Sequence, residues 1–146
     1  MNAHQRLQGE VLEAQLNYWK ETLGDSLPVL ELPTDKPRLP ARTFNGATHS
    51  FDLPKRLSDA FKTMGDRHEA TLFMTLLAAF KVLLYRYTGQ PDILVGSPLA
   101  GRDMLATEGL IGFFVNMLVM RGNLHGDPTF SELLQRTNLE GKEVQV

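Results

Sequence analysis

The sequence predicts an α/β domain in which a few-stranded sheet packs with helices. Its 146 residues are 42% hydrophobic, which is enough for one core. Several stretches repeat apolar residues at helical spacing. Two short runs, residues 92–95 and 111–120, are rich in the branched and aromatic residues of buried strands. Together these observations indicate a single mixed core.

The first predicted element is a helix. Between residues 7 and 23 apolar side chains recur three or four positions apart, and Gly24 suits a left-handed stop. Residues 27–44 hold four of the eight prolines, so we expect an extended connector that clasps a surface. Residues 48–53 alternate polar and less polar side chains, which predicts a short strand.

Two helices are predicted next. Pro54 suits a first turn, and a stripe of apolar residues follows over 57–64, with the stop expected at Gly65 or at the Arg67-His68 pair. Thr71 can cap the second helix, which runs to residue 87 and is apolar on most sides. This helix is the expected centre of the core.

The C-terminal part divides in two. Thr129 and Glu132 have the spacing of a capping box, so a last helix is predicted to start there. From residue 137 to 146 the sequence becomes polar and loses its period, which indicates either a frayed end or a segment without its partner. We therefore expect a domain over residues 1–136 and a polar tail over 137–146.

Composition excludes several classes of function. The formal charge is -2 with no long run of one sign, so neither nucleic acid nor a membrane surface is an expected partner. The longest apolar stretch, residues 70–85, is too short to span a bilayer and contains Lys81. The chain has no cysteine and no apolar leader at its start, so a reducing, cytoplasmic location is expected.

The glycine-rich segment 96–103 resembles a phosphate-binding loop only in its glycine spacing. Arg102 and Asp103 stand where that loop needs lysine and a hydroxyl residue, and Pro98 removes a backbone donor. Ser97 lacks the second glycine of a hydrolase elbow, which favours a turn serine. The four histidines are scattered without metal-ligand spacing, and His49 is interpreted as a structural histidine rather than a base.

Two polar residues are candidates for a site. Asn116 lies in the run 113–118 and is expected to face the core side of its strand, where an unpaired amide costs about 1–3 kcal/mol. It either bonds neighbouring backbone or lines a tunnel or pocket. Arg102 either clamps a carboxylate to fix its loop, which its five-donor fork favours, or is solvated.

Two motifs carry a family resemblance. V-G-S-P-L-A-G-R at residues 95–102 and E-G-L-I-G-F-F-V-N-M-L-V-M-R at 108–121 closely resemble the condensation domains of nonribosomal peptide synthetases, and so does the spacing between them. Four further stretches resemble the family in the same order: residues 18–23, 32–35, 71–74 and 127–130. The likeness covers residues 7–136.

The resemblance implies a two-lobed fold related to chloramphenicol acetyltransferase, of which this chain is the first part of the C-terminal lobe. In such domains two peptidyl carrier proteins present thioesters on phosphopantetheine arms to a tunnel between the lobes, and an amide bond forms there. The family serves secondary metabolite biosynthesis. Its H-H-x-x-x-D-G histidine motif is not in this sequence, so we expect it in an N-terminal lobe that would be a partner of this chain.

The resemblance also assigns site residues. Asn116 matches the asparagine of the F-V-N strand near the tunnel, and Ser97, Gly101 and Arg102 match the preceding turn. None of them supplies a base, so no catalytic residue and no metal ligand is assigned. Met117 stands where the family usually has threonine, and Asn45 where arginine is frequent.

Three functions are distinguished. The first is a fragment of a peptide-bond-forming condensation domain that is inactive alone and lacks the histidine motif. The second is a non-catalytic interaction module that binds a carrier protein, a synthetase or itself as a homo-oligomer. An independent acyltransferase with His49 as its base ranks last, because nothing near His49 in the sequence orients it.

Overall fold

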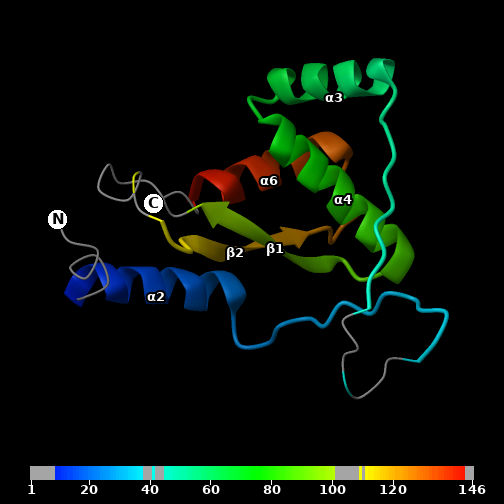
Figure 1. The fold of residues 1–146 in the computed structure, drawn as a ribbon. Helices are drawn as coiled ribbons and strands as arrows, with labels where there is room; N and C mark the ends of the chain where they lie inside the picture. The colour runs from blue at the N-terminus through cyan, green and yellow to red at the C-terminus, as the bar shows by residue number, and fades with distance from the viewer. Residues whose placement is uncertain (1–8, 38–40, 42–44, 101–108, 110, 144–146) are drawn as a thin grey trace.

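The computed structural model describes residues 9–37, 41, 45–100, 109 and 111–143 of the 146. Within these segments four helices accompany two strands (Figure 1). In chain order the elements are α2 (Gly9–Leu23), α3 (Lys55–Arg67), α4 (Leu72–Thr88), β1 (Asp92–Ala100), β2 (Val115–Asn123) and α6 (Phe130–Glu143). The predicted α/β class, with a few-stranded sheet packed with helices, is confirmed.

The two strands form an antiparallel ribbon. Their register runs without a bulge from Asp92 opposite Asn123 to Ala100 opposite Val115. Both strands were expected, but β1 continues through Pro98 and β2 begins at Val115 instead of Ile111. Proline is tolerated in β1 because an edge strand leaves every second backbone group unpaired.

Helices α4 and α6 cover one face of this ribbon. Ile93 of β1 and Met120 of β2 point into it and are buried. They meet a core built from one face of α4 and the first turns of α6, together with Leu124 after β2. The buried cluster comprises Ala70, Met74, Ala78, Leu84, Ile93, Leu124, Leu133 and Leu134. As predicted, α4 is at the centre of the core.

The helix signals of the sequence are confirmed where they were specific. The Thr71 hydroxyl accepts the Met74 N–H at 3.2 Å, and Gly89 ends α4 with φ at 69°. Thr129 and Glu132 form the expected capping box, in which the Glu132 carboxylate accepts from the Thr129 N–H at 2.7 Å. Gly24 follows α2 with φ at 64°. Helix α3 ends at Arg67, the second of the two expected stops.

Two expectations are wrong. Residues 48–53 form no strand, because this exposed segment has no strand beside it among the described residues. The chain does not fray after Arg136, because α6 continues to Glu143. Asn138 is buried there and donates to the carbonyl oxygens of His68 and Glu69 at 3.3 and 3.2 Å, which ties α6 to the turn between α3 and α4. The division of the chain at residue 136 stays a prediction.

The first part of the proline-rich connector, residues 29–31, lies against the body of the molecule, as expected. The Gln90 side chain donates to the Val29 carbonyl at 2.8 Å and accepts the Glu31 N–H at 2.7 Å. Leu30 packs against the core between these two bonds. The side-chain amide of Gln90 thus makes the two hydrogen bonds that the backbone of a neighbouring strand would make to residues 29 and 31.

Candidate functional site

Ser97 and Asn116 lie on the same face of the two-stranded sheet. Residues opposite each other in an antiparallel pair share a face, and Ser97 lies opposite Leu118 while Asn116 lies opposite Leu99. Ser97 and Asn116 are therefore diagonal neighbours on the α4 and α6 side of the ribbon, at a Cα separation of roughly 7–8 Å. The hydroxyl and the amide come from the two motifs that the sequence singled out.

Asn116 is exposed, and the expectation of a buried amide is wrong for this chain. The face was predicted correctly, because Asn116, Leu118 and Met120 share it. Burial rises along this face from Asn116 to Met120, since the helices cover only the second half of β2. A hydrogen-bonding side chain therefore stands on a surface that the described residues do not cover.

The other two predicted site residues cannot be located. Gly101 and Arg102 directly follow β1 but lie outside the described residues. Ser97 itself lies within β1 and pairs with Leu118, so its interpretation as a turn serine is wrong. The assignment of Gly101 and Arg102 to a turn, and the choice between a clamping and a solvated Arg102, stay predictions.

None of the described strand residues on this face has a histidine or carboxylate side chain. His49 stacks on Phe51 at a centroid distance of 6.1 Å in the exposed segment before α3. Across the described part of the chain, no three histidine or carboxylate side chains cluster to hold a metal ion. What the face presents is a hydroxyl and an amide, which can orient a substrate by hydrogen bonds.

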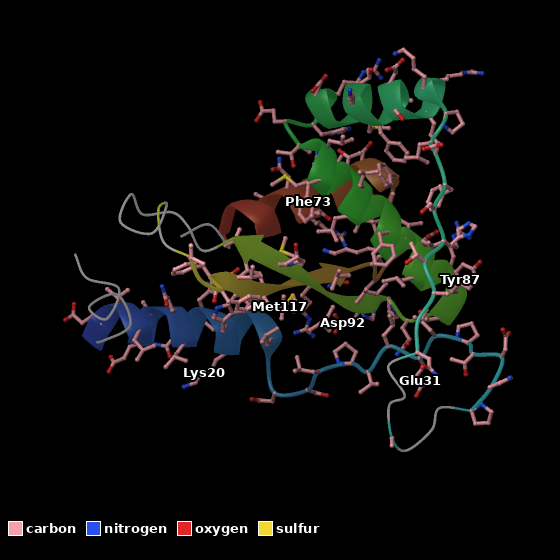
Figure 2. All side chains as sticks on the ribbon, viewed as in Figure 1. Lys20, Glu31, Phe73, Tyr87, Asp92 and Met117 are labelled. Carbon is pink, nitrogen blue, oxygen red and sulfur yellow. The ribbon has the colours of Figure 1, made fainter. Side chains whose placement is uncertain are left out.

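The opposite face of the ribbon carries an ion pair that was not singled out from the sequence. Arg121 donates to both carboxylate oxygens of Asp92, from Nε at 2.9 Å and from Nη2 at 2.6 Å. Its Nη1 donates to the carbonyl oxygens of Thr22 and Leu23 at 3.0 and 2.6 Å. Figure 2 shows Asp92 on this side of the strands. One side chain thereby ties the C-terminal end of α2 to both strands.

The surroundings of Arg121 raise its pKa above the ordinary value. The hydrogen bonds to Asp92 are the largest cause of the raised pKa; burial opposes them, and the charge of that carboxylate adds to them. Carbonyls at a helix C-terminus also favour a cation. Antiparallel pairing of the two motifs would have revealed this pair, because Asp92 begins one strand and Arg121 lies near the end of the other.

Lys81 of α4 lies on the face of the ribbon that α4 and α6 cover. Its side chain is fully buried and passes over Gly122 of β2, so that a Cβ at Gly122 would lie 2.8 Å from the lysine Cε. A side chain at position 122 would force the lysine stem to shift, because the stem occupies that space. The sequence had shown Lys81 only as an interruption of an apolar stretch.

An apolar groove of about 360 Å³ lies where α3 meets α4 and the start of α6. Its lining consists of Leu57, Ala60, Phe61, Met64, Ala79, Val82 and Phe130. No polar side chain lines it, so it cannot orient a polar reactant. Within the described segments no single helix is long and apolar enough to cross a bilayer; only α3 and α4 together pass that test, and the chain bends by 107° between them.

Comparison with known proteins identifies the family. The family model for the condensation domain matches residues 1–145. A linear gramicidin synthase protein of Brevibacillus parabrevis is 58% identical over 130 residues, which cover 89% of this chain and 2% of that protein. Malpibaldin synthetase of Mortierella alpina is 45% identical over 125 residues, covering 86% of this chain and 2% of the synthetase.

Solved structures agree on the fold. The X-domain from teicoplanin biosynthesis superposes with a TM-score of 0.87 at 25% identity, over 97% of this chain and 31% of that one. The condensation domain of the monacolin K polyketide synthase gives 0.75 at 26% identity, over 97% of this chain and 34% of its own. The chain belongs to the condensation domain family of nonribosomal peptide synthetases and spans about a third of such a domain.

Proposed function

We propose that this chain supplies one wall of the reaction tunnel in a condensation domain that joins carrier-bound aminoacyl or peptidyl thioesters by amide bond formation. The observation that carries the proposal is the placement of Ser97 and Asn116, from two family motifs, on the same face of the ribbon, with Asn116 at the end that the described helices leave exposed. The match of the family model over nearly the whole chain supports the same conclusion.

The reaction needs an acceptor amine, a donor thioester and a place for the proton. The amine attacks the thioester carbonyl, the carbon–nitrogen bond forms, and the carbon–sulfur bond breaks to release the thiol of the phosphopantetheine arm. The amide of Asn116 and the hydroxyl of Ser97 can donate hydrogen bonds to polar groups of the bound arms. Neither group takes a proton from an amine near neutral pH, so these residues position reactants.

We further propose that the isolated chain has no activity, because none of the described strand residues on this face is a base. The test uses the purified chain with an aminoacyl donor and an acceptor, each loaded on a carrier protein through phosphopantetheine. Mass spectrometry of the carrier-bound species should show no amide product above a reaction without the chain. Product formed by the isolated chain would contradict this part of the proposal.

The proposed partners follow from the same chemistry. Two peptidyl carrier proteins deliver the substrates, and an N-terminal lobe with the histidine motif completes the tunnel. Gly101 and Arg102 are proposed to border the path of one arm, where a guanidinium can bind a phosphate. A cytoplasmic location is proposed because carrier proteins and their substrates are made there.

A non-catalytic interaction module is the second candidate, and exposed apolar residues favour it. Ile111 and Phe113 are almost fully exposed just before β2. Large apolar side chains gathered at one end of a ribbon are typical of a binding surface. Sedimentation with and without a carrier protein tests this candidate. A chain that forms homo-oligomers or binds the carrier supports it, and a monomer that ignores carrier proteins contradicts it.

A further inference from the structure

The dipeptide Asn45-Gly46 joins a thermolabile side chain to the most permissive backbone position. It lies in the irregular segment of residues 45–54 that leads into α3 (Figure 1), and every residue of this segment is exposed. A Cβ at Gly46 would meet no atom within 4 Å. The backbone beside the Asn45 side chain therefore has room to change its conformation, and water reaches both residues.

The Gly46 nitrogen can approach the side-chain amide carbon of Asn45. Glycine has no Cβ to shield its nitrogen, and it adopts backbone conformations that other residues resist. Among the described residues, neither the Asn45 amide nor the Gly46 N–H has a hydrogen-bond partner. The two groups are therefore free to meet.

The fold holds the other described asparagines in place. They lie within helices or strands: Asn17, Asn116, Asn123 and Asn138. The nitrogen that follows Asn123, for example, belongs to Leu124 and donates to the Pro91 carbonyl at 2.7 Å. None of these asparagines is followed by glycine. Asn45 is thus the one described asparagine that combines a glycine neighbour with an unrestrained backbone.

We infer that Asn45 is a site of spontaneous deamidation, a covalent modification of the chain whose co-reactant is water. A base takes the proton of the Gly46 N–H, and this nitrogen attacks Cγ of Asn45. A carbon–nitrogen bond forms, the bond between Cγ and Nδ2 breaks, and the leaving nitrogen takes a proton and departs as ammonia. The product is a five-membered succinimide ring within the chain.

Water opens this ring in two ways. Attack at Cγ breaks the new carbon–nitrogen bond and gives aspartate. Attack at the main-chain carbonyl carbon of Asn45 breaks its bond to the Gly46 nitrogen and gives isoaspartate, in which the chain continues through Cγ. Either product adds one negative charge to a chain whose formal charge is -2. Because residues 45–54 are exposed, the modification breaks no buried contact.

The test follows the folded chain through days of incubation in neutral and in mildly alkaline buffer. After digestion with trypsin, the peptide of residues 43–55, in which Asn45 is the only asparagine, should gain about one dalton and divide into two chromatographic peaks. The reaction should be faster in the alkaline buffer. Its rate should lie within about tenfold of the rate in a free synthetic peptide of the same residues, because no local unfolding has to precede it.

Two variants and a second tryptic peptide provide the controls. Gly46→Ala has space for its new methyl group and should react roughly tenfold or more slowly, because the Cβ shields the nitrogen. Asn45→Gln should show no gain of mass over the same days, because its ring would need six members. The peptide of residues 122–136, which contains Asn123, should stay unmodified.

Three results would overturn the inference. The first is a folded chain that reacts more than about tenfold more slowly than the free peptide, which would show that the fold protects the site. The second is a Gly46→Ala variant that reacts as fast as the parent chain. The third is a gain of mass in residues 122–136 as fast as in residues 43–55, because the modification would then not be selective for Asn45.

Discussion

Asn116 and Met117 are adjacent in β2 but point to opposite faces, which allows a residue-level test of the site. In a condensation domain whose matching segment is replaced by this chain, Asn116→Ala should lower the rate of amide formation about tenfold, the effect of one lost hydrogen bond of about 1.4 kcal/mol. Met117→Ala removes a side chain that is 66% exposed on the other face and should leave the rate unchanged. Equal losses in both variants would contradict the assignment of the face.

Gly122 is the glycine at which substitution by alanine should lower the stability of the fold most clearly. In Gly122→Ala the new Cβ would overlap the buried stem of Lys81, which must then move against the core. Urea unfolding should show a free energy of unfolding lower by about 1–3 kcal/mol, as for other overpacked cores. Gly46→Ala has open space around its Cβ and should change stability by less than about 0.5 kcal/mol. A stable Gly122→Ala variant would show that Lys81 is not fixed over the strand.

Glu132 makes the stability of the first turn of α6 depend on pH. Hydrogen bonds from the Thr129 N–H and hydroxyl lower its pKa below the ordinary value. The pKa of Glu132 is lower in the folded chain than in the unfolded chain. Its contribution to the stability of the folded state is therefore complete above the ordinary glutamate pKa of about 4.3, and it is lost as the pH falls through the pKa of the folded state. In Glu132→Gln the thermal midpoint should fall less between about pH 5 and pH 3 than in the parent chain. An identical fall in both chains would show that the capping box is not formed in solution.

At the scale of elements, Arg121 determines how α2 is held. No side chain of α2 is buried, and the four hydrogen bonds of Arg121 join its last carbonyls to Asp92. Arg121→Lys cannot reproduce this planar fork, so α2 should loosen and stability should fall by roughly 1–3 kcal/mol. Trp19, the only tryptophan, lies on α2 and should report greater mobility as lower fluorescence anisotropy.

A second arginine provides the control for this change. Arg136 donates one hydrogen bond, to the Asn123 carbonyl at 2.8 Å, and is exposed. Arg136→Lys should leave the anisotropy of Trp19 as it is in the parent. An unchanged anisotropy in Arg121→Lys would mean that other contacts hold α2. The raised pKa of Arg121 implies that its contribution is complete throughout the neutral range and is lost only as the pH rises through the folded value.

Local signals in the sequence predicted the helices well and the irregular segments less well. Thr71, Gly89 and the Thr129–Glu132 pair act within one turn of chain, so their geometry could be predicted without knowing the fold. Residues 48–53 alternate like a strand but have no described neighbour to pair with, and pairing is a long-range property. The bond from Asn138 to the turn after α3 is equally long-range, so the extent of α6 could not be read from the polar sequence after Arg136.

At the scale of the whole molecule, the sequence predicted the face on which Asn116 lies but not how that face is covered. Strand parity put Asn116 on the correct face, and pairing of the two motifs placed Ser97 beside it. The exposure of Asn116 was not predicted, because it depends on which part of β2 the helices cover, and that is a long-range property of the fold. The Arg121–Asp92 pair was missed because it is also long-range: the two residues are 29 positions apart in the sequence and meet only through the register of the two strands.

The central claim is that this chain is a working wall of a condensation tunnel once the rest of a domain surrounds it. The most direct measurement is amide formation by the condensation domain of the linear gramicidin synthase after its matching segment is replaced by this chain, assayed with loaded donor and acceptor carriers. We predict that the folded chimera forms the amide, while the same chimera with its upstream histidine motif disabled does not. A folded chimera that binds both carriers but forms no amide would contradict the account.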